Sequence, residues 1–177
     1  MHSFELYMST RLVYGADSIE KLAAAAAPYG KRALITYGGG SVVRSGLLER
    51  VKKALAGFEV VEFSGIEPNP RVSSVNAAAK LAREQKVDFI VAVGGGSVID
   101  ASKAIAAAVK YEGDAWDLVK DGSLIKDALP LFSVLTLAAT GSEYDAPGVI
   151  SNMQTNEKQA ISSPLLFPKA SFCDPSV

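Results

Sequence analysis

The 177-residue chain has only one cysteine and one histidine, and its formal net charge is −1. The single cysteine, Cys173, excludes an internal disulfide and is typical of a reducing compartment. The small net charge argues against a nucleic-acid-binding surface. No apolar run approaches the roughly 18 residues of a membrane span, and residues 1–5 do not begin a signal peptide. We therefore expect a cytoplasmic protein without a nucleic-acid or membrane partner.

Apolar residues, by contrast, are plentiful and fall into alternating strand-like and helix-like segments. Hydrophobic residues make up 49% of the chain and charged residues 21%, a balance typical of a globular domain. We expect strands at residues 32–37, 59–63, 89–93, 131–135 and 170–173, and helices at residues 19–27, 42–56, 72–85 and 98–110. This alternation predicts an α/β fold, a Rossmann-like parallel sheet with helices on both faces.

The remaining segments give weaker signals. Residues 4–14 are typical of an extended pair around Ser9 and Thr10, and Asp17 or Ser18 is placed to cap the helix that follows. Residues 112–128 are expected to be irregular, and the chain after Asn152 to be less regular than the part before it.

A short apolar strand followed by three glycines and a serine occurs twice. The second copy consists of Gly94, Gly95, Gly96 and Ser97. A helix start offers unpaired N–H groups, and glycine lets a bound group approach the backbone, so the N–H groups of residues 95–97 predict a pyrophosphate cradle. Gly94 and Asp100 are also candidate cofactor-binding residues. The alternative is a tight turn in which Ser97 caps the helix in a capping box with Asp100. The loop matches neither the GxGxxG fingerprint nor the Walker motif.

The first copy consists of Gly38, Gly39, Gly40 and Ser41, and it contains no acid. Dinucleotide folds that bind an unmodified adenosine ribose often place an acidic side chain near this point. Its absence leaves room for a 2′-phosphate, to which Ser41 can donate, and so favours NADP. The alternative is a glycine-rich turn with no ligand.

A third group of polar residues follows the expected strand at residues 131–135. The hydroxyls of Thr136, Thr140 and Ser142 are expected at the carboxyl edge of the sheet, where open α/β folds bind ligands. The alternative is a Ser/Thr-capped turn with Glu143 as its capping carboxylate.

Five motifs in this order resemble a known family. They are Tyr37-Gly-Gly-Gly-Ser41, Gly65-Ile-Glu-Pro-Asn-Pro70, Val93-Gly-Gly-Gly-Ser-Val-Ile-Asp100, Thr136-Leu-Ala-Ala-Thr-Gly-Ser-Glu143 and Val149-Ile-Ser-Asn152. Together they are similar to the N-terminal half of the iron-containing (group III) alcohol dehydrogenases. The similarity is greatest to the NADPH-dependent butanol dehydrogenase or broad aldehyde reductase type, and it covers residues 4–175.

The resemblance implies that residues 1–177 form the dinucleotide-binding N-terminal domain of an enzyme acting on a small-molecule alcohol or aldehyde. We also expect a homo-oligomer, because the absence of a partner domain would expose apolar surface. It implies that Asn69 lies near the adenosine and that Thr136 and Thr140 contact the pyrophosphate and nicotinamide side. Val149 and Lys158 would line the cofactor cleft. Relatives that prefer NAD tend to carry an acid near Gly39, which agrees with the charge argument for NADP.

The family's Fe or Zn is bound by one aspartate and three histidines of a helical second domain. This chain ends at Val177, before those positions, so we name no catalytic or metal-binding residue and expect the chain alone to be inactive. His2 cannot replace three histidines. Two alternatives remain: a noncatalytic nucleotide-binding or assembly module, and a relative of glycerol dehydrogenase or dehydroquinate synthase.

Two departures from the family pattern lie near the expected cleft. Ala138 stands where the family usually has proline, and Asp145-Ala-Pro147 stands where it often has an Asn-Ala-Gly type sequence. Asp145 is expected to add a negative charge near the cleft, and Pro147 to stiffen it.

Overall fold

The computed structural model describes residue 3 and residues 8–177. His2 and the first arm of the expected extended pair lie outside the described residues. The second arm is a strand, β1 (Arg11–Tyr14), which ends just before Gly15.

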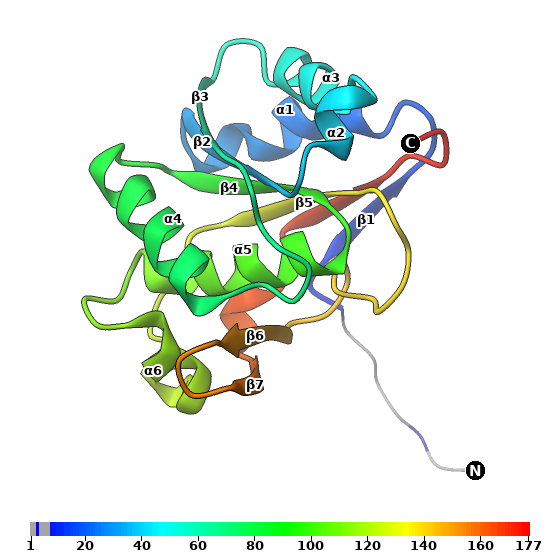
Figure 1. The fold of residues 1–177 in the computed structure, drawn as a ribbon. Coiled ribbons are helices and arrows are strands. Elements are labelled where there is room, and N and C mark those ends of the chain that lie inside the picture. Colours follow the sequence, from blue (N-terminus) through cyan, green and yellow to red (C-terminus); the bar gives the residue numbers. More distant parts are fainter. Residues whose placement is uncertain (1–2, 4–7) are drawn as a thin grey trace.

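A six-stranded parallel sheet forms the centre of the molecule (Figure 1), with the strand order β1-β8-β5-β4-β2-β3. Beside β1 it contains β2 (Arg32–Tyr37), β3 (Glu59–Phe63), β4 (Phe89–Gly94), β5 (Leu131–Leu135) and β8 (Ala170–Cys173). Every residue of β4 and β5 is buried, as expected for central strands with helices on both faces. The predicted fold class and these strands are confirmed.

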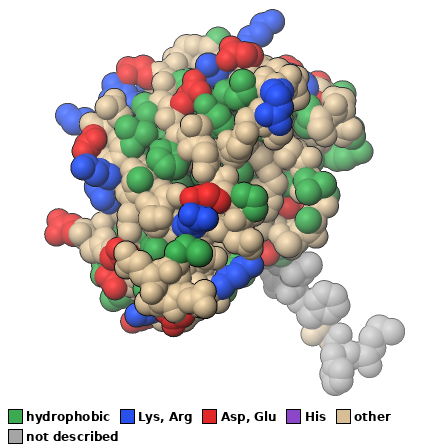
Figure 2. Space-filling model, in the orientation of Figure 1, with side chains coloured by type: hydrophobic (Ala, Val, Ile, Leu, Met, Phe, Trp, Pro, Cys, Tyr) green, Lys and Arg blue, Asp and Glu red, His purple; other side chains and the backbone are tan. Residues whose placement is uncertain are grey.

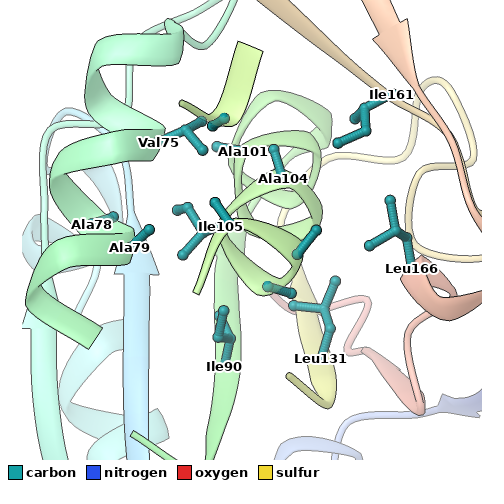
Figure 3. Packing of buried hydrophobic residues seen from close by; sticks show 14 of the residues in the cluster. Val75, Ala78, Ala79, Ile90, Ala101, Ala104, Ile105, Leu131, Ile161 and Leu166 are labelled. Carbon is teal, nitrogen blue, oxygen red and sulfur yellow. The ribbon is translucent and has the colours of Figure 1, made fainter. Parts of the chain in front are cut away.

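Helices cover both faces of the sheet, as Figure 1 shows. One face carries α1 (Leu22–Ala26), α2 (Ser41–Arg44) and α3 (Leu47–Ala54), and the other carries α4 (Val72–Glu84), α5 (Gly96–Ala108) and α6 (Ala115–Lys120). Side chains of β4 alternate between the two cores. Phe89 and Val91 join the core beneath α1 and α3, whereas Ile90 joins the core of α4 and α5. Figure 3 shows Ile90 of β4 and Ile105 of α5 among the residues of this second core.

The surface carries mixed charge. On the face drawn in Figure 2, lysine and arginine side chains are interspersed with aspartate and glutamate. Within the described part of the chain, none of the helices has both the length and the apolar character required to cross a membrane.

Two expected helices differ from the observed ones. The helix expected at residues 42–56 is divided into α2 and α3, because Gly46 has a φ of 79°, outside the helical region. The helix expected at residues 19–27 consists of η1 (Ile19–Lys21), α1 and η2 (Ala27–Tyr29). Ser18 precedes it without a side-chain capping bond, and Asp17 pairs with Lys21 instead, so neither acts as the predicted cap.

Regular structure also occurs where we expected little. In the segment 112–128, Asp114 caps α6 by accepting the N–H of Trp116 at 2.7 Å, and η3 (Gly122–Leu124) follows. Near the end of the chain, β6 (Gly148–Asn152) and β7 (Glu157–Ile161) form an antiparallel hairpin, followed by η4 (Pro164–Leu166). This hairpin brings Lys158 to the candidate site.

Candidate functional site

The second glycine loop lies at the carboxyl end of β4. Gly95 is the N-cap of α5 and has an extended backbone, and its carbonyl accepts the N–H groups of Val98 and Ile99. The N–H groups of Gly96 and Ser97 precede these first intrahelical bonds, so they are among the free donors of a helix start. The positive end of the helix dipole lies at the same point. The loop therefore has the geometry of an anion cradle.

Ser97 does not cap the helix, and the predicted capping box is wrong. The helix begins at Gly96, one residue before Ser97, and its N-cap residue, Gly95, has no side-chain capping bond. Asp100 makes long-range bonds instead. Its Oδ1 accepts the hydroxyl of Ser142 at 2.7 Å, and its Oδ2 accepts the N–H of Val149 at 3.0 Å. Asp100 thus joins α5 to the segment that follows β5.

The three glycines of this loop have different neighbours. A Cβ on Gly94 would lie 2.6 Å from a methyl carbon of Val98, so this position requires glycine for packing. A Cβ on Gly96 would lie 3.1 Å from the hydroxyl oxygen of Thr140. A Cβ on Gly95 would make only an ordinary contact, at 3.6 Å from Leu137. The protein itself leaves space at Gly95.

A pocket of about 330 Å³ adjoins this helix start. It brings together predicted site residues from five separate segments of the chain: Asn69, Gly96, Ser97, Asp100, Thr140, Val149 and Lys158. Sequence reasoning missed three further lining residues, Pro70, Leu137 and Ala139. All three belong to motifs that it had singled out, but an apolar side chain gives no chemical signal of its own.

Asn69 and Lys158 close one side of the pocket. The Nζ of Lys158 donates to Oδ1 of Asn69 at 2.6 Å, and Asn69 has a positive φ of 57°. The N–H of Ser151 donates to the carbonyl of Pro70 at 2.8 Å, which ties the β6–β7 hairpin to the same loop. Lys158 places an exposed cation at a pocket whose only acidic lining residue is Asp100. This balance suits an anionic ligand.

The first glycine loop lies on the neighbouring strand. Tyr37 pairs with Val93, so the two glycine runs begin at the same level of adjacent strands. Gly40 has a φ of 99° and precedes α2, while Gly38 accepts the N–H of Gly65 through its carbonyl. A Cβ on Gly39 would meet no atom within 4 Å, so this position is open.

Thr136 and Ser41 line a different hollow, of about 480 Å³, beside α2 and α3. The structure therefore does not bring Thr136 into the same pocket as Thr140. The predicted site residues that line neither hollow are Gly38, Gly39, Gly40, Gly94 and Gly95. Arg50 lines the larger hollow, but its guanidinium is already bonded to Asp174, Glu20 and the carbonyl of Ala16. We regard the smaller pocket as the candidate site because it contains the free N–H groups of α5.

Metal-ligating side chains do not come together in residue 3 and residues 8–177, which contain no group of three or more His, Cys, Asp or Glu side chains suited to a metal ion. The residues described here therefore do not fit the metal that the resemblance implies for the full-length enzyme.

Comparison with known proteins identifies the family. The family model described as iron-containing alcohol dehydrogenase matches residues 9–175. The chain belongs to the iron-containing alcohol dehydrogenase family. The predicted resemblance is confirmed.

Members of the iron-containing alcohol dehydrogenase family match nearly the whole chain. A probable NADH-dependent butanol dehydrogenase from Bacillus subtilis is 52% identical, over 99% of this chain and 46% of its own length. An NADPH-dependent aldehyde reductase from Escherichia coli is 48% identical over the same shares. The crystal structure of an NADH-dependent butanol dehydrogenase from Thermotoga maritima superposes with a TM-score of 0.94 at 42% identity, covering 99% of this chain and 45% of that one. The chain thus spans about half the length of these relatives.

Proposed function

We propose that residues 1–177 are the dinucleotide-binding domain of an NAD(P)H-dependent alcohol dehydrogenase or aldehyde reductase. One observation carries this proposal: the free N–H groups of Gly96 and Ser97 face a pocket that also holds Thr140 and Lys158. Backbone donors, a hydroxyl and an ammonium are the groups that bind phosphate oxygens. The names of the relatives, which refer to NADH or NADPH, support the same ligand class.

The chemistry in the full-length enzyme would be hydride transfer. A bound NAD(P)H would supply hydride chemistry, the reduction of an aldehyde to an alcohol. In this proposal the residues of this chain bind and orient the dinucleotide. The pyrophosphate would lie on Gly95, Gly96 and Ser97, with Asn69 toward the adenosine. The homo-oligomeric state and the cytoplasmic location remain predictions.

Within this class we propose a preference for NADP(H). Gly39 is open and carries no carboxylate, and the hydroxyl of Ser41 follows it at the start of α2. Glu62 on the neighbouring strand is an acid, but its carboxylate is held by Lys52 at 2.9 Å and by the hydroxyl of Tyr37 at 2.9 Å. The relatives' names are divided between NADH and NADPH. The proposed preference therefore rests on the residues of the loop and not on the relatives.

Calorimetric titration of the chain with NADPH and with NADH tests the preference. A hydrogen bond to a charged group contributes about 1.5–3 kcal/mol, so NADPH should bind roughly tenfold to a hundredfold more tightly. Gly39→Asp should abolish or reverse this ratio, because its carboxylate repels a 2′-phosphate and accepts a ribose hydroxyl.

Ala56→Asp is the matched control. It adds the same charge at an exposed position after α3, away from the pocket, and should leave the ratio unchanged. Equal affinity of the unmodified chain for the two cofactors would refute the NADP preference. A ratio that Gly39→Asp does not alter would do the same. Binding of either cofactor would still support the dinucleotide site.

A further inference from the structure

Lys103 is a buried ionisable residue that does not line the cofactor pocket. Its side chain, in the middle of α5, has no solvent exposure, and burial lowers its pKa from the ordinary lysine value. Its Nζ donates to Oδ1 of Asp145 at 2.8 Å and to the carbonyl of Pro147 at 2.6 Å. The negative charge that Asp145 is expected to add near the cleft is paired with Lys103.

Lys103 and Asp100 act on the same short segment. They stand three residues apart on α5, on one face of the helix. Lys103 bonds to the carbonyl of Pro147, and Asp100 accepts the N–H of Val149. Between these two bonds, a Cβ on Gly148 would lie 3.1 Å from the backbone of Asp100. Three consecutive residues, 147–149, are therefore held directly against α5.

This attachment reaches the candidate site at two points. Val149 lines the pocket, and its N–H is one of the bonds that hold the segment. Thr140 is also a lining residue, and its hydroxyl oxygen lies 3.0 Å from that of Ser142. The Ser142 hydroxyl donates to Asp100. The position of both lining residues depends on how the segment 140–149 is attached to α5.

Stability alone gives no reason for a lysine at this place. Removing an ionisable group from water is unfavourable, and a hydrophobic side chain of similar volume is often at least as stabilising. Ile99 and Ile105 fill fully buried positions on the same helix with hydrocarbon only. The two directed bonds of Lys103 provide orientation, which a hydrocarbon cannot.

We propose that Lys103 is a positioning residue that fixes the segment 140–149 against the cofactor pocket through Asp145 and the Pro147 carbonyl. This inference rests on the proposed dinucleotide site. It adds a residue outside the pocket to the determinants of cofactor affinity.

The test is Lys103→Met, studied by titration with NADPH and by amide NMR. Loss of the two bonds should weaken NADPH binding about tenfold, the size of one hydrogen bond to a charged group. Without nucleotide, the Val149 amide should shift and exchange faster, while the amides of β4 stay protected. Ile105→Val is the matched control: it removes one buried methylene from α5 and should change neither the affinity nor the Val149 amide.

Asp145 provides a second pair of variants should Lys103→Met fail to fold. Its side chain is 45% exposed, so Asp145→Ala should fold and show the same changes in a weaker form. Asp145→Asn keeps the acceptor oxygen and should restore most of the affinity. The proposal is overturned if Lys103→Met binds NADPH with wild-type affinity and its Val149 amide is unchanged. If Lys103→Met does not fold, the same two results for Asp145→Ala overturn it. An unmodified chain that binds no NADPH counts against the proposed function instead, and the Val149 measurement still decides the attachment.

Discussion

At the scale of single residues, the three glycines at the end of β4 serve different needs. Gly94 is required by its close contact with Val98, whereas Gly95 has space that the protein does not use. A ligand cradle explains the second case, since a side chain at Gly95 would occupy the place of the pyrophosphate. The two positions can therefore be separated by experiment.

Gly94→Ala should destabilise the fold. Its Cβ would lie 2.6 Å from Val98, and overpacking of this kind costs about 1–3 kcal/mol. Urea unfolding followed by circular dichroism measures the change. A midpoint equal to that of the unmodified chain would show that the β4–α5 turn adjusts without strain.

Gly95→Val should retain the fold and bind NADPH at least tenfold more weakly. The loss of one hydrogen bond to a charged phosphate sets this lower limit on the change in affinity. Its first side-chain atom makes only an ordinary contact, 3.6 Å from Leu137. Calorimetry gives the affinity, and urea unfolding shows that the stability is retained. Unchanged affinity would mean that the loop is only a turn.

The sequence predicted the members of the site better than their contacts. Gly96, Ser97 and Thr140 were found because glycines and hydroxyls at strand ends have a direct chemical meaning. The capping box of Asp100 with Ser97 was wrong, because the hydrogen-bond partners of Asp100 lie 42 and 49 residues away in the chain. Local capping rules carry no information about such distant partners.

At the scale of elements, sequence patterns predicted buried strands well and breaks in helices poorly. The strand β4 is a short continuous apolar run that ends in glycines, and such a run is a clear signal of a buried strand. The division between α2 and α3 was missed because buried residues continue on both sides of Gly46. The β6–β7 hairpin was missed because β7 is mostly polar, with only Ile161 fully buried.

Arg50 connects three elements of the fold. From α3 it bonds to Glu20 of η1 at 2.8 Å and to Asp174, just after β8, at 2.6 Å. The pKa of Asp174 is lowered from its ordinary 3.8, first by hydrogen bonds from Ser176 and then by Arg50. A lowered carboxyl pKa stabilises the fold above the ordinary value, and this contribution is lost as the pH falls through the lowered pKa.

Asp174→Asn should therefore lower the melting temperature at neutral pH. The difference from the unmodified chain should shrink as the pH falls below about 3.8, where the unfolded chain is protonated first. It should vanish below the lowered pKa, where Asp174 is protonated in both states. Thermal unfolding at several pH values gives this difference directly. A gap that stays constant down to the acid limit would show that the carboxylate charge plays no part.

At the scale of the whole molecule, the parallel sheet brings distant segments to one edge. β2, β4 and β5 all end at the carboxyl edge, and each is followed by one of the glycine or hydroxyl motifs. The hairpin then adds Lys158 to the same pocket. The chain spans about half of its relatives' length. In our proposal, this edge of the sheet is the part of the enzyme that binds the cofactor.

Backbone amide NMR of the 177-residue chain during titration with NADPH tests the central claim most directly. We predict saturable shifts that are largest at Gly95, Gly96 and Ser97 and that extend to Thr140 and Val149. Absence of saturable shifts at the start of α5 would contradict the account, as would shifts confined to the larger hollow beside α2 and α3.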